Sequence, residues 1–196
     1  MKRTRRILSM IFDSLGASFI YGFLIRRGKL SGIADIDIKK PIFFILGFGL
    51  EFGVLNLTDK YPIIMTYRAY IHFLDYLMLF IGLWYNRHNK YMKVIAIGII
   101  LNFIVIFVNG GRMPVSINAL NAAGISYLVP ELQKNVIPTH QAMTAATKFK
   151  FLCDILYLPK PYPLPKTFSV GDLFIATGIF LMVSNAMIKA SKKVKI

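Results

Sequence analysis

The sequence alternates long apolar stretches with short polar connections, and five of the stretches have the length of a membrane span. They cover residues 7–25, 41–57, 69–84, 92–109 and 172–188. An α-helix rises about 1.5 Å per residue, so such stretches cross a hydrocarbon core of about 30 Å with little or modest adjustment. We therefore expect an all-α fold: one integral membrane domain built as a bundle of five transmembrane helices.

The connection between the fourth and fifth stretches, residues 110–171, is much longer than the others and holds seven of the nine prolines. Structureless loops of this length are uncommon, so we expect an ordered helical cap on the membrane surface. Within it, "SINALNAAG" and "THQAMTAATKFKFLCDIL" have the pattern of short amphipathic helices, with Ser116 and Thr139 as N-caps. The alternating prolines of "LPKPYPLPK" favour an extended polyproline-type segment.

The first two stretches each allow two interpretations. The basic start "KRTRR" is typical of a signal peptide, but Asp13 interrupts the apolar core and no small-residue cleavage site follows. We therefore expect the first stretch to be a permanent helix. In the second stretch, Gly49 and Gly53 have the spacing that lets helices approach closely. Packing within the chain is favoured here over dimer formation.

Composition agrees with a membrane protein, because 56% of the residues are hydrophobic and the mean hydropathy is +0.56. The net charge of +15 is typical of nucleic-acid binding proteins. Here, however, the basic residues flank apolar stretches, where they meet anionic lipid headgroups. We expect membrane lipid and no nucleic acid as a partner. The single cysteine excludes an internal disulfide, and the three histidines lack zinc-ligand spacing, so we expect no metal and no cofactor.

Polar residues within the apolar stretches fall in one half of the bilayer. Because successive spans run in opposite directions, the position of each residue in its stretch fixes its side, and all six lie on the side where residues 110–171 emerge: Asp13, Glu51, His72, Asp75, Asn109 and Asp172. Ionisable groups inside spans are costly and often functional. Asp13 and Asp172, near span ends, could instead reach the interface. His72 and Asp75 share a helix face and could hydrogen-bond to each other or to Glu51.

The orientation follows from the basic residues, which concentrate on the cytoplasmic side of membrane proteins. Each side of the bundle carries half of the 24 basic residues. On the side opposite the cap they lie in short segments with few acids, which gives the higher charge density. We therefore expect the C-terminus in the cytoplasm and the cap outside the cell, although the basic "KRTRR" start favours the reverse.

Three segments resemble a known family: "RRGKLSGIADIDIKKPIFFILGFGLEF", "NGGRMPVS" and "FLCDILYLPKPYPLPKTFSVGDLFIATGIF". They are similar to small bacterial polytopic membrane proteins grouped as domain of unknown function 5317. The resemblance covers nearly the whole chain, and "NGGRMPVS" and "FSVGD" carry most of its specificity. It implies a bacterial cell membrane location and an architecture of helices with a cap before the last one, but no activity. The basic N-terminal extension departs from the family pattern.

The "NGGRMPVS" element is typical of a helix that ends and a chain that turns sharply. Asn109 and Gly110 suit a helix C-terminus, and Gly110 with Gly111 permits a tight turn. Arg112 then has no structural role in this pattern. Its guanidinium group could hold a carboxylate of the chain, namely Asp154, Asp172 or Glu51, or an external lipid headgroup or anionic ligand. In "FSVGD", Ser169 or Asp172 can cap the last helix.

Three functions remain open at this level. The first is binding of a lipid headgroup or anionic ligand, or docking of a partner membrane protein. The second is an enzyme acting on a lipid-linked substrate with acid–base groups. The third, a transporter, lacks an evident repeat. A Cys153–His140 peptidase is a weaker alternative, because the surrounding motifs are missing. The candidate ligand-binding or polar-network residues are Glu51, His72, Asp75, Asn109, Gly110, Gly111, Arg112, His140, Asp154, Ser169 and Asp172.

Overall fold

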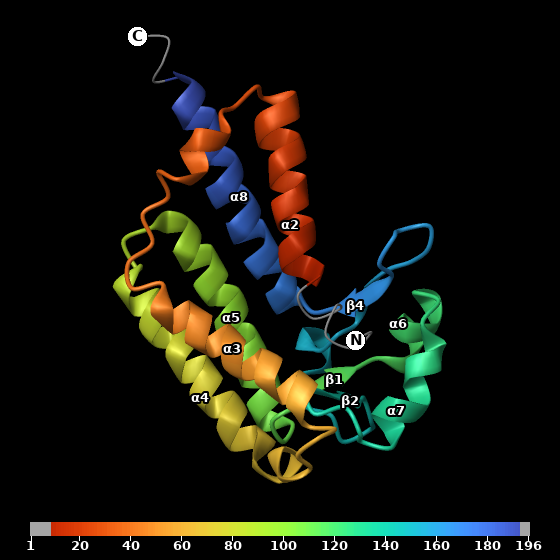
Figure 1. Ribbon diagram of the computed structural model, residues 1–196. Helices are drawn as coiled ribbons and strands as arrows, with labels where there is room; N and C mark the ends of the chain where they lie inside the picture. Colours follow the sequence, from red (N-terminus) through yellow and green to blue (C-terminus); the bar gives the residue numbers. More distant parts are fainter. Residues whose placement is uncertain (1–8, 193–196) are drawn as a thin grey trace.

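The computed structural model describes residues 9–192, in which five long helical segments are joined to a cap of short elements (Figure 1). The long segments are α2 (Ser9–Phe19) with its π-helical continuation η1 (Ile20–Ile25), α3 (Ile42–Leu57), α4 (Ile63–Tyr85), α5 (Lys90–Val108) and α8 (Val170–Lys192). A 3-10 turn, η2 (Leu30–Ile33), lies between η1 and α3. The "KRTRR" start and residues 7 and 8 of the first expected stretch lie outside the described residues.

All five expected stretches are helical in the part that is described, but they are not equal as membrane spans. By length and composition, α5 and α8 are able to cross a membrane. The first segment and α3 are apolar but shorter. The remaining long helix, α4, has 23 residues and contains Arg68, His72 and Asp75. The structure thus contains two candidate membrane spans, and the arrangement of five spans is taken up below as a proposal.

The helices form a row in which α8 packs between α2 and α5, α4 packs against α5, and α3 packs against α4. Figure 1 shows α2 and α8 side by side at one end of this row and α3 with α4 at the other. Aromatic rings fill the α4–α5 contact, where Tyr76 and Phe80 of α4 meet Phe103 of α5 at centroid distances of 5.4 and 5.3 Å. The two ends of the row leave a space between α2 and α3.

Glycine makes the closest helix contact possible. A Cβ atom on Gly171 would overlap the side-chain oxygen of Asn102, and one on Gly98 would overlap the backbone oxygen of Gly171. The α5 and α8 backbones therefore approach each other directly. The packing role expected for Gly49 and Gly53 was wrong, because a Cβ atom at either position would meet nothing within 4 Å.

We expected a helical cap, but residues 110–171 form strands as well as helices. The cap contains helices α6 (Ile117–Ala122) and α7 (Val129–Gln133), 3-10 turns η3 (Ser126–Leu128) and η4 (Lys150–Leu152), and strands β1 (Met113–Val115), β2 (His140–Ala142), β3 (Leu156–Leu158) and β4 (Lys166–Phe168). Strands β1 and β2 pair in parallel, and β3 and β4 pair antiparallel. The all-α expectation is corrected by these two small sheets.

Strand β1 is the centre of the cap. On one side, the Met113 N–H donates to the carbonyl oxygen of Thr139 at 2.9 Å. On the other side, the Asp154 N–H donates to the carbonyl oxygen of Pro114 at 3.0 Å. All three residues of the strand are buried. The Met-Pro-Val part of the "NGGRMPVS" element therefore forms a buried strand in the interior of the cap.

Two local expectations in the cap were wrong and one is confirmed. Thr139 does not cap a helix, because residues 140–142 form β2 and pair with β1. The proline-rich segment is no extended strand, since it turns between β3 and β4. Ser116 does cap α6, and its Oγ accepts a hydrogen bond from the Ala119 N–H at 3.3 Å.

The end of α5 matches the expectation from "NGG". Gly110 and Gly111 have φ angles of +80° and +78°. The Gly111 N–H donates to the carbonyl oxygen of Ile106, and the Gly110 N–H donates to that of Phe107. These two bonds are the Schellman pattern, which satisfies the last carbonyl groups of a helix. The turn sends the chain directly into β1.

Candidate functional site

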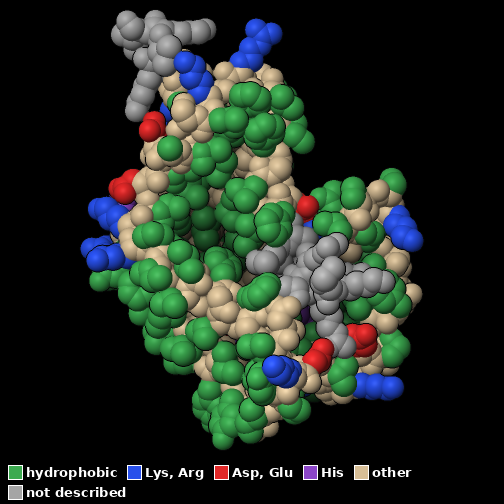
Figure 2. All heavy atoms as spheres, viewed as in Figure 1, with side chains coloured by type: hydrophobic (Ala, Val, Ile, Leu, Met, Phe, Trp, Pro, Cys, Tyr) green, Lys and Arg blue, Asp and Glu red, His purple; other side chains and the backbone are tan. Residues whose placement is uncertain are grey.

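A cavity of about 510 Å³ lies where the helices meet the cap. Its apolar walls come from the five long helical segments and include Met10, Ile11, Phe44, Ile45, Phe48, Leu79, Ile99, Ile175, Ala176 and Ile179. Its polar lining includes Glu51, His72, Asp75, Asn102, Thr139, His140, Asp154, Lys166 and Asp172. Figure 2 shows the surface hollowed between the α2–α8 pair and α3, with hydrophobic side chains around the hollow. The polar groups thus gather where the helices meet the cap, and the rest of the lining is apolar, including Val115, Leu120 and Leu132 of the cap.

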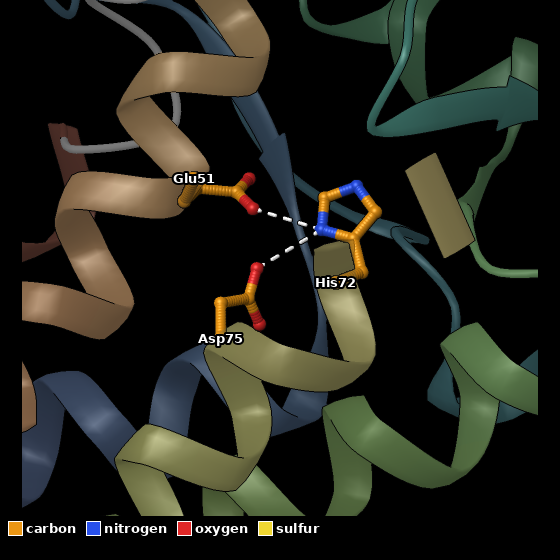
Figure 3. Close-up of side chains that lie close together, drawn as sticks. All are labelled: Glu51, His72 and Asp75. Carbon is orange, nitrogen blue, oxygen red and sulfur yellow. Dashed lines mark hydrogen bonds and ion pairs between the residues drawn. The ribbon is translucent and has the colours of Figure 1, made fainter. Parts of the chain in front are cut away.

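Glu51, His72 and Asp75 form a tight group within this polar lining (Figure 3). The Nδ1 atom of His72 lies 3.1 Å from Oδ2 of Asp75 and 3.1 Å from Oε2 of Glu51. His72 and Asp75 are 4% and 3% exposed. The contacts that the sequence allowed between these side chains are therefore present. Glu51 comes from α3, whereas the other two lie one turn apart on α4.

Asp172 takes part in a second polar group, at the start of α8. Its Oδ2 accepts from the Ser169 N–H at 3.0 Å, and its own N–H donates to Ser169 Oγ at 3.0 Å. Its Oδ1 accepts from Nδ2 of Asn102 on α5 at 2.8 Å. This reciprocal capping confirms the expectation from "FSVGD" and adds a link between two helices.

His140 and Asp154 approach the cavity from the cap. His140 Nε2 lies 3.6 Å from Oδ2 of Asp154, and its Nδ1 is 2.7 Å from the hydroxyl oxygen of Thr139. Burial lowers the pKa of His140, although the carboxylates of Glu51 and Asp172 oppose this. Burial raises the pKa of Asp154 well above its usual value, and Asp172 adds to the shift. The neutral forms of both groups are therefore favoured in the folded chain.

A buried ion pair joins the first helix to the cap. The ammonium group of Lys166, in β4, contacts the carboxylate of Asp13, in α2. Lys166 is 2% exposed, and its Nζ lies 5.5 Å from the centre of the Tyr162 ring. A hydrogen bond to Asp13 raises the pKa of Tyr162 to about 12, with burial as a smaller cause. Asp13 is thus held by the chain and does not simply reach the membrane interface.

Arg112 makes none of the expected carboxylate contacts. Its Nη1 donates to the carbonyl oxygen of Asn135 at 3.3 Å, and its buried Nε has no hydrogen-bond partner. It forms no ion pair with Glu51, Asp154 or Asp172 among the described residues. Burial and the neighbouring Arg68 lower the pKa of the Arg112 side chain. The internal ion pair expected from the sequence was therefore wrong.

The Cys153–His140 pair is not assembled. The Cys153 thiol is buried and lies 3.6 Å from the carbonyl oxygen of Phe149, while His140 contacts Thr139 and Asp154. Burial raises the pKa of this thiol to about 11, and Asp154 adds to the shift. A nucleophilic cysteine needs the opposite shift, so this arrangement does not support a peptidase.

The cavity gathers six of the candidate residues and leaves the others in structural positions. Glu51, His72, Asp75, His140, Asp154 and Asp172 line it. Asn109 instead holds the cap, because its side chain donates to the carbonyl oxygen of Lys148 and accepts from the Lys148 N–H. Sequence reasoning missed Asn102, although it is a lone amide in an apolar stretch. It also missed Lys166, because one lysine among prolines carries no signal.

Comparison with known proteins identifies a family for the chain but gives no activity. A family model described as a family of unknown function, DUF5317, matches residues 35–184. An uncharacterized protein of Thermotoga maritima is 31% identical over 157 residues, which span 80% of this chain and 81% of the relative. No solved structure matches the chain. The family match begins after α2, so it covers less of the N-terminal part than the shared motifs indicated.

Proposed function

This chain belongs to the DUF5317 family, and because the family is one of unknown function, we propose a role from the cavity itself. We propose that the protein is an integral membrane protein that binds an amphiphilic lipid. The hydrocarbon chain of the lipid lies along the apolar walls, and its polar head lies beneath the cap. The observation that carries this proposal is the single cavity with an apolar wall and a polar end.

A membrane environment is supported by the outer surface of the helices. In α5 and α8, 33% of the most apolar window is buried, so two thirds of it is at least partly exposed. The other long helices also expose large apolar side chains, among them Phe12, Ile20, Leu24, Ile42, Phe52, Tyr70 and Phe73. Soluble proteins rarely expose contiguous apolar surface of this extent. Lipid contact around all five helices accounts for it, including the shorter first segment and α3.

Entry of the lipid chain is supported by the position of the hollow. The apolar walls belong to α2, α3, α4, α5 and α8, and α2 and α3 make no extensive contact among the described elements. A hydrocarbon chain in the bilayer would therefore reach the cavity sideways, between these two helices (Figure 2). A lipid tail in the bilayer is already out of water, so close packing in the cavity and contacts of the polar head, and not the hydrophobic effect, would hold it there.

The chemistry of the polar end favours a head that donates hydrogen bonds. Carboxylate and amide oxygens dominate it, and the one lysine or arginine among the described lining residues, Lys166, is engaged by Asp13. Hydroxyl or amino groups of a lipid head match such acceptors, whereas a bare anionic head does not. If the cap lies outside the cell, as the basic residues indicate, the lipid comes from the outer leaflet.

Native mass spectrometry of the detergent-purified protein tests lipid binding. We expect the wild-type chain to retain a lipid of defined mass. The variant Ile45→Trp fills the apolar wall of the cavity and should lose most of this lipid. Leu46→Trp is the matched control, since Leu46 is the next residue on α3, is similarly exposed and does not line the cavity.

Two results would count against the proposal. One is a wild-type spectrum without any lipid of defined mass after mild detergent extraction. The other is equal lipid retention by Ile45→Trp and Leu46→Trp when both variants are monodisperse and equally helical. In the second case the lipid binds to the outer belt of the helices and not within the cavity.

A further inference from the structure

Three donor atoms from two helices converge on one point in the polar lining. Figure 3 shows the carboxylates of Glu51 and Asp75 approaching the same nitrogen of His72 from different sides. One donor atom from each of the three residues lies within 4.8 Å of the other two. The positions are fixed by secondary structure, because His72 and Asp75 are one helical turn apart and α3 packs against α4.

Hydrogen bonds alone leave this group unsatisfied. The single N–H that His72 can offer at Nδ1 has two carboxylate oxygens at the same distance, 3.1 Å. In addition, Oδ1 of Asp75 and Nε2 of His72 are buried and have no hydrogen-bond partner. Both side chains are more than nine-tenths buried. Even with His72 protonated, two ionised carboxylates leave a net negative charge at this largely buried point, which is costly unless a cation joins them.

We propose that Glu51, His72 and Asp75 bind one divalent transition-metal cation. Metal–ligand bonds of about 2.1 Å, at angles between octahedral and tetrahedral, hold neighbouring donor atoms about 3.0–3.4 Å apart. The two measured separations of 3.1 Å fall within this range. In the bound state His72 is neutral and presents the Nδ1 lone pair to the cation, while its Nε2–H faces away from both carboxylates.

The donor set selects the class of cation. One imidazole nitrogen with two carboxylate oxygens suits zinc, manganese or ferrous iron. Magnesium and calcium prefer oxygen ligands alone, and copper(I) prefers sulfur. Three protein ligands also leave a coordination position open toward the cavity, as in zinc sites that bind a water or substrate. The sequence indicated that these three side chains could meet, but we expected no metal, because Glu51 is 21 residues from His72, on another helix, and the spacing matches no metal motif.

Metal binding is tested on the full chain, purified with a histidine-free tag, stripped with chelator and titrated with Zn²⁺ or Mn²⁺. We expect about one equivalent of metal per chain by elemental mass spectrometry and a higher midpoint of thermal unfolding. Glu51→Gln and Asp75→Asn keep the side-chain shapes but remove ligand charge, and each should weaken binding at least tenfold. Glu51 is the safer variant for folding, because its side chain is 23% exposed.

Asp172→Asn is the matched control. Asp172 is another carboxylate of the same cavity, but its oxygens are already bonded to Asn102 and Ser169. This variant should bind metal as the wild-type chain does. Failure of the wild-type chain to bind metal, or equal binding by Glu51→Gln, would overturn the proposal, and surface binding would then explain any residual metal. The metal titration contains no added lipid, so its outcome and the outcome of the lipid-retention experiment test the two proposals separately.

Discussion

At the scale of single residues, the motif "FSVGD" shows what a short pattern can predict. Ser169 and Asp172 are spaced for mutual capping, and they form it. The third member, Asn102, is 70 residues from Asp172. No local pattern could pair these two, because their contact depends on how α5 packs against α8. For Arg112, the local pattern gave the wrong partner. Its chemistry indicated a carboxylate, but in the fold its guanidinium group donates to the carbonyl oxygen of Asn135.

Replacing Asp172 by alanine should lower the stability of the protein by about 2–4 kcal/mol. About 1 kcal/mol comes from the lost cap, and the rest from the buried Asn102 amide that loses its acceptor. The midpoint of thermal unfolding in detergent measures the effect. Asp172→Asn keeps an oxygen at this position and should lower the stability by less. Equal midpoints for the alanine variant and the wild-type chain would show that the network is not structural.

The raised pKa of Cys153, about 11, predicts how the alkylation rate of the thiol changes with pH. Alkylation requires the thiolate, so the folded protein should react slowly at pH 8, and its rate should still be rising at pH 10. The rate for the unfolded chain should level off near about pH 10, since an ordinary cysteine has a pKa of about 8.5. Rates of iodoacetamide labelling with and without denaturant provide the comparison. A plateau below pH 8 in the folded chain would instead indicate an activated thiol.

At the scale of elements, sequence periodicity predicted the long helices well and the cap poorly. The helices depend on local apolar runs, and their ends on local caps such as "NGG". Strand β1, by contrast, is three residues long and pairs with residues 140–142. Such short strands have no periodicity of their own, so their existence depends on distant partners. Residues 139–156 were wrongly expected to be helical, because their apolar residues repeat as in an amphipathic helix. These apolar residues instead belong to the interior of the cap.

The helix contacts predict opposite effects for two glycine substitutions. Gly171→Ala should destabilise the protein, because its Cβ would overlap Asn102 and the backbone of Gly98. Gly49→Ala should be neutral or slightly stabilising, because it meets open space and alanine favours a helix by about 1 kcal/mol. Unfolding midpoints of the two variants in the same detergent compare them directly. Equal destabilisation by both would contradict the close α5–α8 contact.

At the scale of the whole molecule, the parity of the helices predicted where the polar groups lie. Because consecutive helices run in opposite directions, the end of α3 and the starts of α4 and α8 lie at the end of the bundle that carries the cap, as Figure 1 shows. Polar residues of all three helices line the cavity there. This argument needed only the order of the helices. The shape of the cavity could not be predicted in the same way, because it depends on which helices fail to touch.

The proposed topology can be tested by labelling single cysteines in intact cells, in a Cys153→Ala background. Gln133 lies exposed in the cap, and His88 lies exposed in the turn between α4 and α5. If the cap is outside, a membrane-impermeant maleimide should label Gln133→Cys and should label His88→Cys only after the cells are opened. The reverse pattern would invert the orientation. Labelling of both in intact cells would contradict an odd number of spans between them.

The ion pair between Lys166 and Asp13 has a consequence for how such proteins diversify. It fastens α2, which the family match does not include, to the cap, which the match does include. Met10 and Ile11 of α2 complete the apolar wall, whereas Glu51, His72 and Asp75 lie within the matched range. The family model thus leaves the first helix undefined. On the proposed lipid-binding role, a chain with a different first helix would keep the same chemistry at the polar end and accept a tail of different length or branching.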